Sequence, residues 1–320
     1  MANFFTSDTL IADVQRRAMI PNTQQTFQEA DFLAFANEEL LIGCVPHVLS
    51  FHQEYFVHTQ FVPLVANTSR YPIPTRAIGT KLRDVSYMDV SGNIFEMSRI
   101  KIEDIPSYQN NVIQNSFTLF YMEGNDLMLI PVVGANPVGT LRFSYYIRPN
   151  EMVPTNQVGI VNGIASGALV NNYPTTVVTL SNIPSTFNLT EPLDIVQTQN
   201  PFQTIGINIT PLAMNTITNT LTFYSYQISL QLMVGDHIAL AEQTIVPQIP
   251  ADIHSMLSQR VAARCLEALG DTQGLQNANL KLTEMENKTG TILEDRVEGQ
   301  PLKVFPKHSA LKRKKLYWRS

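Results

Sequence analysis

Catalytic or metal-binding chemistry in this sequence would have to come from its histidines, two cysteines and scattered carboxylates. The six histidines are His47, His52, His58, His237, His254 and His308. His52 and His58 are six residues apart, which fits neither a helical i, i+4 metal pair nor a zinc motif. The adjacent Glu38 and Glu39 would point about 100° apart on a helix, which favours a solvated face. We therefore predict no catalytic, cofactor-binding or metal site.

Paired carboxylates could cleave a glycan, because glycosidases place two carboxyl groups ~5–9.5 Å apart. The candidates in this chain are Asp84, Asp89, Glu96, Glu123 and Asp126. Nothing in their spacing brings two of them to that distance. The sequence also lacks a P-loop, G-x-G-x-x-G, G-x-S-x-G or C-x-x-C motif. These features favour a protein that is not an enzyme.

The residues best suited to a binding role lie at the end of the chain. Residues 301–320 hold seven Lys or Arg and no acid, although the whole chain has a net charge of −5. A segment of this composition cannot fold alone and should order on a partner. Trp, Tyr and Arg dominate binding hot spots, so we predict a docking arm; a solubilising tail is the alternative. The predicted docking residues are Lys312, Arg313, Lys314, Lys315, Leu316, Tyr317, Trp318 and Arg319.

The composition indicates a globular chain that forms an oligomer. Only 15% of residues are charged, against roughly 25% in ordinary soluble domains, and interface cores are depleted of charge. Cys44 and Cys265 lie in helix-like apolar patterns, as buried thiols in a reducing compartment would. No run approaches 18 continuous apolar residues, so we expect no membrane span.

Helical patterns occupy both ends of the chain. Thr6 or Ser7 can cap a first helix, and Thr26 with Glu29 forms a capping box for a second, in which Pro46 predicts a kink or a division into two consecutive helices. After Pro250, apolar residues recur every four positions at Ile253, Leu257, Val261, Cys265 and Leu269. Gly270 ends that helix, and a second seam follows at Leu275, Ala278, Leu282, Met285, Thr289 and Ile292. The short connection predicts an antiparallel pair.

The middle of the chain has strand patterns. Expected strands of a first, antiparallel unit are 59–64, 82–89, 94–97, 117–123, 127–132 and 139–147. No Lys or Arg occurs between Arg148 and Arg260, which marks a separate β module. Its expected strands are 175–180, 194–197, 204–209, 220–228 and 237–240. Gly159, Gly163 and Gly167 are expected in a loop or turn.

These patterns together predict an α+β fold. It combines a helical bundle of N- and C-terminal helices with an antiparallel β domain, an inserted all-β module and an extended C-terminal tail. The predicted units are 1–58 (N-terminal helices), 59–149 (β domain), 150–249 (inserted module), 250–298 (helix pair) and 299–320 (basic docking tail).

Several segments resemble the head-to-tail connector (adaptor, or neck ring) proteins of tailed bacteriophages. They are Gln53-Glu54-Tyr55-Phe56, Arg70-Tyr71-Pro72-Ile73-Pro74, the 120–131 hairpin, Tyr145-Tyr146-Ile147-Arg148-Pro149, Ile249 to His254 and Leu269-Gly270-Asp271. The resemblance covers residues 1–149 and 246–320. The module 150–245 goes beyond the minimal family pattern.

The resemblance implies a structural protein of the virion neck, made in the host cytoplasm. Its copies would form a ring, with twelve the expected number, that binds the portal and extends the DNA channel toward the tail. Further partners would be tail or neck proteins, and DNA that passes through the channel without sequence-specific binding. No membrane would be bound. The alternative is a virion-associated glycan-cleaving or receptor-binding protein acting through the inserted module. A third alternative is nucleic-acid binding through the tail alone, with strong salt dependence.

Overall fold

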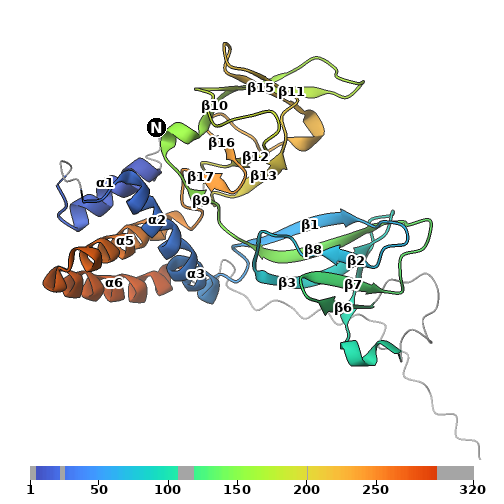
Figure 1. Cartoon of the computed structure of the whole chain (residues 1–320), viewed down its shortest axis with the longest axis horizontal. Helices are drawn as coiled ribbons and strands as arrows, with labels where there is room; N and C mark the ends of the chain where they lie inside the picture. Colours follow the sequence, from blue (N-terminus) through green and yellow to red (C-terminus); the bar gives the residue numbers. More distant parts are fainter. Residues whose placement is uncertain (1–4, 22–25, 107–118, 200, 294–320) are drawn as a thin grey trace, which may run out of the picture.

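The structure, a computed structural model, describes residues 5–21, 26–106, 119–199 and 201–293. Helices and several antiparallel sheets are both present, which confirms the predicted α+β class. Figure 1 shows a helical bundle on one side, a two-sheet β-sandwich beside it, and a further sheet above both. The predicted docking residues 312–319 lie outside the described residues.

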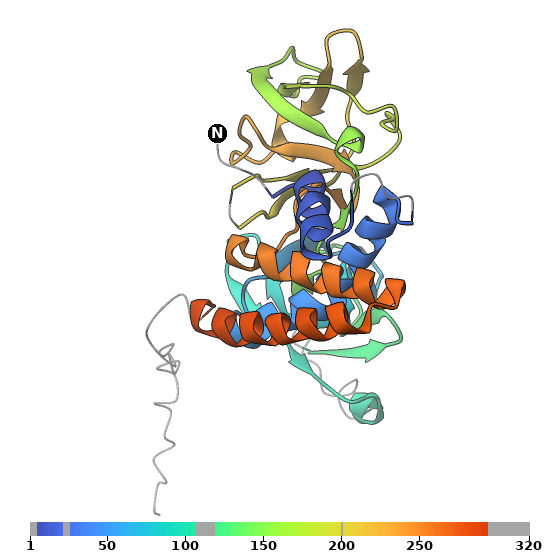
Figure 2. The ribbon, with the colours of Figure 1, turned by 90° about the vertical axis from the view of Figure 1, so that its left-hand side faces the viewer.

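The helical bundle joins the two ends of the chain. Its helices are α1 (Ser7–Arg17), α2 (Glu29–Glu39), α3 (Val45–Phe51), α5 (His254–Leu269) and α6 (Thr272–Ile292). Figure 2 shows α5 and α6 side by side, with α1 above them. Helix α5 is the central one, because it contacts α1, α2 and α6. Its buried residues Met256, Leu257 and Val261 pack in one core with Leu10 and Phe32.

Local signals at the helix ends explain where these helices begin and end. Thr6 caps α1, since its hydroxyl accepts a hydrogen bond from the Thr9 N–H. The capping box of α2 uses Gln28 and Asp31, so the predicted box at Thr26 and Glu29 was placed wrongly. Gly270 ends α5 at a φ of +73°, a left-handed conformation that glycine adopts without strain.

The predicted kink near Pro46 takes the form of a wide turn. A π-helical segment, Leu40–Cys44, joins α2 to α3, and Pro46 lies in the first turn of α3. A proline lacks the N–H for the helical ladder and its ring crowds the carbonyl four residues earlier. The wider π turn removes that conflict while the helix continues.

The predicted seams of α5 and α6 are confirmed in the middle and wrong at the ends. Ile253, Leu257, Val261 and Cys265 are buried, as are Ala278 and Thr289 of α6. Leu269 and Ile292 are 46% and 59% exposed. Both residues are the last of their helices.

The β-sandwich consists of two four-stranded sheets. The first has the order β1 (Val57–Pro63), β8 (Thr140–Ile147), β3 (Ala77–Met88) and β4 (Ile94–Glu96). The second has the order β2 (Arg70–Pro72), β7 (Asp126–Ile130), β6 (Leu119–Glu123) and β5 (Ser98–Arg99). Their facing sides enclose one core that includes Tyr71, Val85, Leu127, Leu141 and Phe143. The pairing is antiparallel except for β5 with β6, which is parallel.

A separate seven-stranded sheet, which we call the insert, lies above the sandwich (Figure 1). Its order is β13 (Thr204–Ile209), β12 (Leu193–Val196), β16 (His237–Leu240), β10 (Gly159–Ser166), β11 (Thr175–Leu180), β15 (Thr220–Tyr224) and β14 (Ala213–Asn215). Its core includes Val161, Val178, Ile195, Phe223 and Ile238. Two short parallel strands below it, β9 (Glu151–Met152) and β17 (Gln243–Thr244), border the bundle.

The prediction of a loop or turn around Gly159, Gly163 and Gly167 was wrong, because Gly159–Ser166 is strand β10. A bulge falls between Val161 and Gly163. A Cβ on Gly159 would lie 2.6 Å from the Leu180 side chain. The glycine therefore permits a close approach of β10 and β11, and glycine within a strand can have this role as well as marking a bulge.

Candidate functional site

The bundle, the sandwich and the insert meet around two segments, residues 76–78 at the start of β3 and residues 147–152, which lead from β8 to β9; we call this region the junction and the two segments its crossings. Three consecutive residues, Arg76, Ala77 and Ile78, each contact a different part of the molecule. Arg76 reaches into the insert, Ala77 is buried in the sandwich core and Ile78 packs on the bundle core. A large bulge in β3 permits this, since Ala77 pairs with Ile147 and Leu82 already pairs with Tyr145.

The strongest contact of the junction joins Arg76 to Asp194 of β12. Arg76 is 4% exposed and Asp194 is 0% exposed. The guanidinium donates two hydrogen bonds, from Nη1 to Oδ2 at 2.5 Å and from Nη2 to Oδ1 at 3.0 Å. This bidentate geometry fixes orientation as well as distance. It ties the start of β3 to the insert, 118 residues further along the chain.

The remaining acceptor capacity of Asp194 is also used. Its carboxylate accepts hydrogen bonds from the side-chain amide of Asn150 at 2.9 Å and from the N–H groups of Asn208 and Glu242, each at 3.0 Å. A buried ion pair is compatible with stability only when its other polar groups are satisfied. The Asp194 carboxylate meets that condition, whereas Arg76 Nε has no hydrogen bond to any described residue and lies 3.6 Å from Glu242 Oε1.

The second crossing connects the same three parts. The Arg148 N–H donates to the Arg76 carbonyl at 2.8 Å, and the Asn150 N–H donates to Gln248 Oε1 at 2.6 Å. Met152 is buried in the bundle core, and its backbone exchanges two hydrogen bonds with the Asn37 side chain, at 2.7 and 3.1 Å. The two crossings therefore hold the three parts as one body.

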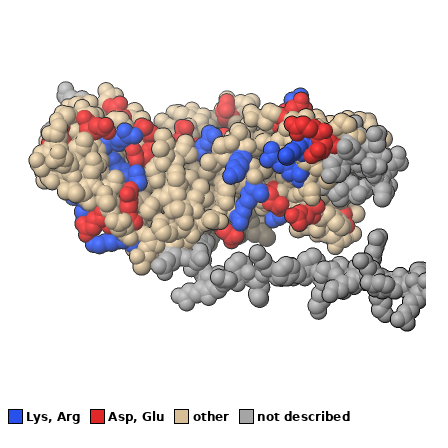
Figure 3. Space-filling view, turned by 90° about the horizontal axis from the view of Figure 1, so that it is seen from below, with Lys and Arg blue, Asp and Glu red and all other residues tan. Residues whose placement is uncertain are grey.

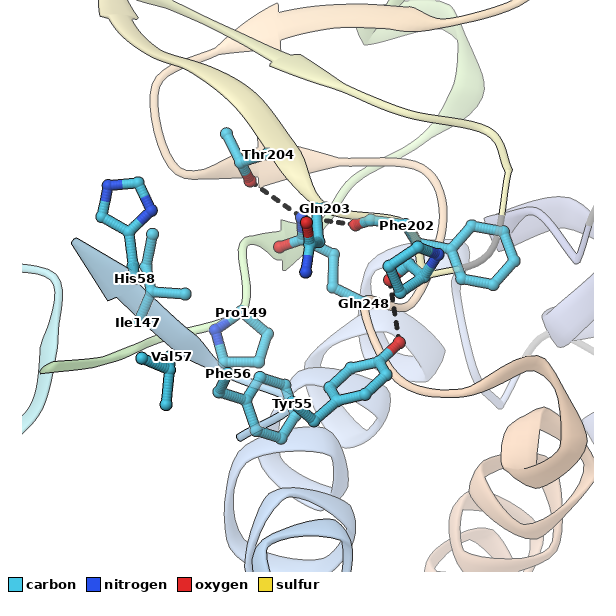
Figure 4. Close-up of a pocket in the computed structure, with 11 residues that line it drawn as sticks. Tyr55, Phe56, Val57, His58, Ile147, Pro149, Phe202, Gln203, Thr204 and Gln248 are labelled. Atoms are coloured by element: carbon cyan, nitrogen blue, oxygen red, sulfur yellow. Dashed lines mark hydrogen bonds between the residues drawn. The ribbon is translucent and has the colours of Figure 1, made fainter. Parts of the chain in front are cut away.

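A small cavity lies in the junction between the start of β1 and the insert (Figure 4). The Tyr55 hydroxyl donates to the Pro201 carbonyl at 2.8 Å. The Gln248 amide donates to the Phe202 carbonyl at 3.0 Å and to the Thr204 hydroxyl at 2.8 Å. The cavity volume is about 70 Å³, whereas small-molecule pockets are roughly 300–1,000 Å³. The cavity is thus a packing seam with room for water.

An ion-pair network crosses the bundle and corrects the solvated-face prediction for Glu39, whereas Glu38 is exposed as predicted, at 47%. The Glu39 carboxylate, 12% exposed, pairs with Arg264 at 2.7 Å and with Arg260 at 3.3 Å. Glu38 pairs with Arg264 at 3.0 Å, and Arg260 also pairs with Glu286 of α6. Gly43 allows Arg260 to approach, since a Cβ there would lie 2.7 Å from Nη1. The network joins α2, α5 and α6.

Among the candidate carboxylates, Asp84, Asp89 and Asp126 make structural contacts. Asp84 pairs with Arg142 at 3.6 Å and Asp126 with Arg70 at 2.7 Å, while Asp89 accepts hydrogen bonds from its own turn. Burial raises the pKa of Cys44 to about 12 and of Cys265 to about 11, so both thiols are unreactive. In the described ranges, no group of three or more His, Cys, Asp or Glu could hold a metal ion.

The surface charge is mixed. Figure 3 shows Lys and Arg beside Asp and Glu over the sandwich and the end of the bundle, with a largely uncharged area between them. Two open grooves on the sandwich, of 840 and 580 Å³, are lined by both signs, including Lys81, Asp84, Lys101 and Glu103. This face does not provide the single-sign field that phosphate binding requires.

One segment, Glu29–Phe51, is long and apolar enough to cross a membrane by length and composition alone. It spans α2, the π turn and α3, and includes charged residues at its start. Phe32, Ala36, Leu40, Cys44 and Val48 are buried in the bundle core. This apolar face is therefore used in packing, as in the core helix of a bundle.

The fold and the junction describe an α+β protein with several parts held together, and with a buried polar cluster that orients them. The sequence model of the SU10 adaptor protein family matches residues 5–181. The chain belongs to the SU10 adaptor protein family and is a bacteriophage adaptor protein. The match contains both crossings of the junction and extends into the insert, which the resemblance in the sequence did not. No curated protein matches the chain.

Several segments that carry the family resemblance lie at the junction, but the sequence did not predict that they are close together in space. Tyr55, Ile147 and Pro149 line the junction cavity, and Arg76 follows the Tyr-Pro-Ile-Pro segment by two residues. Asp194 was missed. One signal could have found it, because an isolated acid inside a strand of a charge-poor module requires a buried partner.

Proposed function

We propose that this adaptor protein is a head-to-tail connector whose copies form a ring, twelve in number, that binds the portal and extends the DNA channel toward the tail. The observation that carries the proposal is the adaptor family match over residues 5–181. The junction supports it, because a subunit that transmits position between two neighbours needs parts fixed in relative orientation. The work of such a subunit is binding, without catalysis.

The proposal includes a location and a set of partners. The ring would lie in the virion neck after synthesis in the host cytoplasm. It would contact the portal on one side and tail or further neck proteins on the other, and DNA would pass through without sequence-specific contacts. An acidic body suits such passage, since residues 1–300 carry a net charge of −12.

Deletion of residues 301–320 should abolish portal binding. The docking arm carries seven cations and the only Trp of the chain, and many copies of a weak arm in one ring multiply its avidity. Binding is measured by co-sedimentation with purified portal, with thermal unfolding of the truncated chain as the folding control. Trp318→Ala should weaken binding, whereas Ser309→Ala, outside the predicted docking residues, should leave it unchanged. A truncated chain with unchanged affinity would rule out the docking arm.

One observation favours the second function, a receptor-binding role of the insert. Tyr173, Tyr224 and Tyr226 form an aromatic cluster in which Tyr224 and Tyr226 stack with ring centroids 5.3 Å apart. Tyr173 and Tyr226 are 57% and 71% exposed, in a module without Lys or Arg. Rigid exposed tyrosines are common in recognition surfaces. They favour binding of a host-surface glycan over its cleavage.

The full-length protein distinguishes the two functions in a glycan-binding assay. Under the connector proposal, neither the unmodified chain nor Tyr226→Ala binds host-surface glycan or releases its fragments. Binding that Tyr226→Ala abolishes would support the receptor-binding role.

A further inference from the structure

The first sheet of the sandwich has two outer strands that are both exposed. Its order is β1-β8-β3-β4, so β1 and β4 lie on opposite sides of one sheet. In the described part of the chain, no further strand pairs with either of them. Strand β1 has no charged residue and exposes Phe61 by 52%, and β4 exposes Ile94 by 55%. Unprotected apolar edges of this kind are templates for pairing with another chain.

The hydrogen bonds of β1 show which of its backbone groups face outward. Ile147 donates to the Phe56 carbonyl at 2.8 Å, and Leu64 donates to the Gly139 carbonyl at 3.4 Å. Because bonding alternates along an antiparallel pair, residues 58, 60 and 62 also bond to β8. The N–H and C=O groups of Thr59 and Phe61 therefore point away from the sheet.

The same argument applies to β4. Asp89 donates to the Asn93 carbonyl at 3.1 Å, and Met97 donates to the Val85 carbonyl at 3.3 Å. Tyr87 lies opposite Phe95, so the backbone groups of Asn93, Phe95 and Met97 form hydrogen bonds with β3. The backbone groups of Ile94 and Glu96 point outward. Each edge thus offers two residues, two positions apart, whose N–H and C=O groups point outward: Thr59 and Phe61 in β1, and Ile94 and Glu96 in β4.

We propose that β1 of one copy pairs with β4 of the next copy, with Thr59 opposite Glu96 and Phe61 opposite Ile94. The register forms four backbone hydrogen bonds, two for each pair. It also places the exposed side chains of Phe61 and Ile94 directly opposite each other on one face. Such cross-strand apolar pairs stabilise sheets. No other register of these two edges uses all four outward residues.

The direction and symmetry of the pairing also fit a ring. All neighbouring strands in this sheet are antiparallel, so β1 and β4 run in opposite directions, and adding β4 of a neighbour to β1 continues the alternation. The contact joins two different edges, and a contact of this heterologous type generates a ring when the rotation between copies closes and an open filament when it does not. The inference rests on the proposed ring and defines one of its subunit contacts. The start of β1, at Val57 and His58, lies beside the insert across the junction cavity.

Replacing Thr59 with proline tests the backbone pairing. Thr59→Pro removes an outward N–H and leaves every bond between β1 and β8 in place, and proline is tolerated on edge strands. We expect Thr59→Pro to fold and to lose the ring. Thr59→Val keeps the N–H and the branched shape, so it should form rings as the unmodified chain does. The readout is mass photometry, with circular dichroism as the folding control.

A disulfide tests the register without relying on a destabilising change. In the proposed register Gln60 lies opposite Phe95 in a non-hydrogen-bonded pair, where Cα atoms are about 4.5 Å apart, within the range for a disulfide. Within one copy, three strand spacings of about 4.8 Å separate the two positions. Oxidised Gln60→Cys/Phe95→Cys should therefore give a ladder of linked copies. Thr59→Cys/Phe95→Cys, which places the thiols on opposite faces, should not.

The outcomes separate this inference from the function on which it rests. If the unmodified chain forms rings and Thr59→Pro also forms rings, the edge pairing is wrong and the ring stands. The same holds if the unmodified chain forms rings but oxidised Gln60→Cys/Phe95→Cys gives no ladder of linked copies. An unmodified chain that stays monomeric at every concentration and with portal would contradict the ring itself.

Discussion

Replacing Asp194 with alanine is expected to lower the free energy of unfolding by about 3–5 kcal/mol, because the buried Arg76 would lose its bidentate partner and keep only Glu242, 3.6 Å from Nε. Asp194 also accepts hydrogen bonds from the side-chain amide of Asn150 and from the N–H groups of Asn208 and Glu242, and each of these donors would lose that acceptor. Urea denaturation of the unmodified chain and of Asp194→Ala measures the difference.

An exposed ion pair in the sandwich provides the matched control. Asp126 pairs with Arg70 at 2.7 Å, but the Arg70 side chain is 63% exposed. Arg70→Ala should therefore cost less than about 1 kcal/mol. Equal losses for Asp194→Ala and Arg70→Ala would show that the buried pair does not stabilise the junction.

The second large effect is expected on acidification. His237 and His254 are 3% and 4% exposed, and burial lowers the pKa of each to about 4 from the ordinary value near 6.5. Between pH 4 and pH 6.5, the unfolded chain therefore binds more protons than the folded chain. The stabilisation is complete above pH 6.5 and is lost as the pH falls toward 4, by about 3 kcal/mol for each histidine.

The histidine contribution is isolated by variants that do not titrate in this range. His254 Nε2 lies 3.1 Å from the Ile249 carbonyl, and a glutamine amide can donate the same hydrogen bond. His254→Gln should lose less stability than the unmodified chain between pH 7 and pH 4, and His237→Gln should do likewise. Parallel stability curves for all three proteins would mean that neither histidine is responsible.

His254 matters for more than stability because of its position. Its ring packs between Phe5, which precedes α1, and Phe202 of the insert, with ring centroids 5.0 and 5.2 Å away. Protonation would place a charge where the bundle meets the insert. Acid should therefore loosen the junction before it unfolds the individual parts.

The sequence predicted the elements whose signals are local. Gly270, the Thr6 cap and the spacing of Leu257, Val261 and Cys265 define helices from within a few residues, and each is confirmed. Strands with clear alternation, such as β8 and β15, were predicted for the same reason. The helix seams were wrong at Leu269 and Ile292, the last residues of α5 and α6, which are exposed.

The elements that were missed depend on distant partners. Strand β2 has three residues and contains Pro72, and β10 contains glycines that signal a loop when read alone. The Arg76–Asp194 pair joins residues 118 positions apart, so no local pattern reports it. Glu39 was predicted as solvated because its partners, Arg260 and Arg264, lie on a helix from the other end of the chain.

The central claim is that this adaptor protein acts as a ring subunit that binds the portal and catalyses no reaction. Electron microscopy of the purified protein, alone and mixed with its portal, tests it most directly. We expect rings stacked on the portal in the mixture, and their loss when residues 301–320 are removed. A protein that remains a single copy in the mixture and leaves the portal unoccupied would contradict the claim.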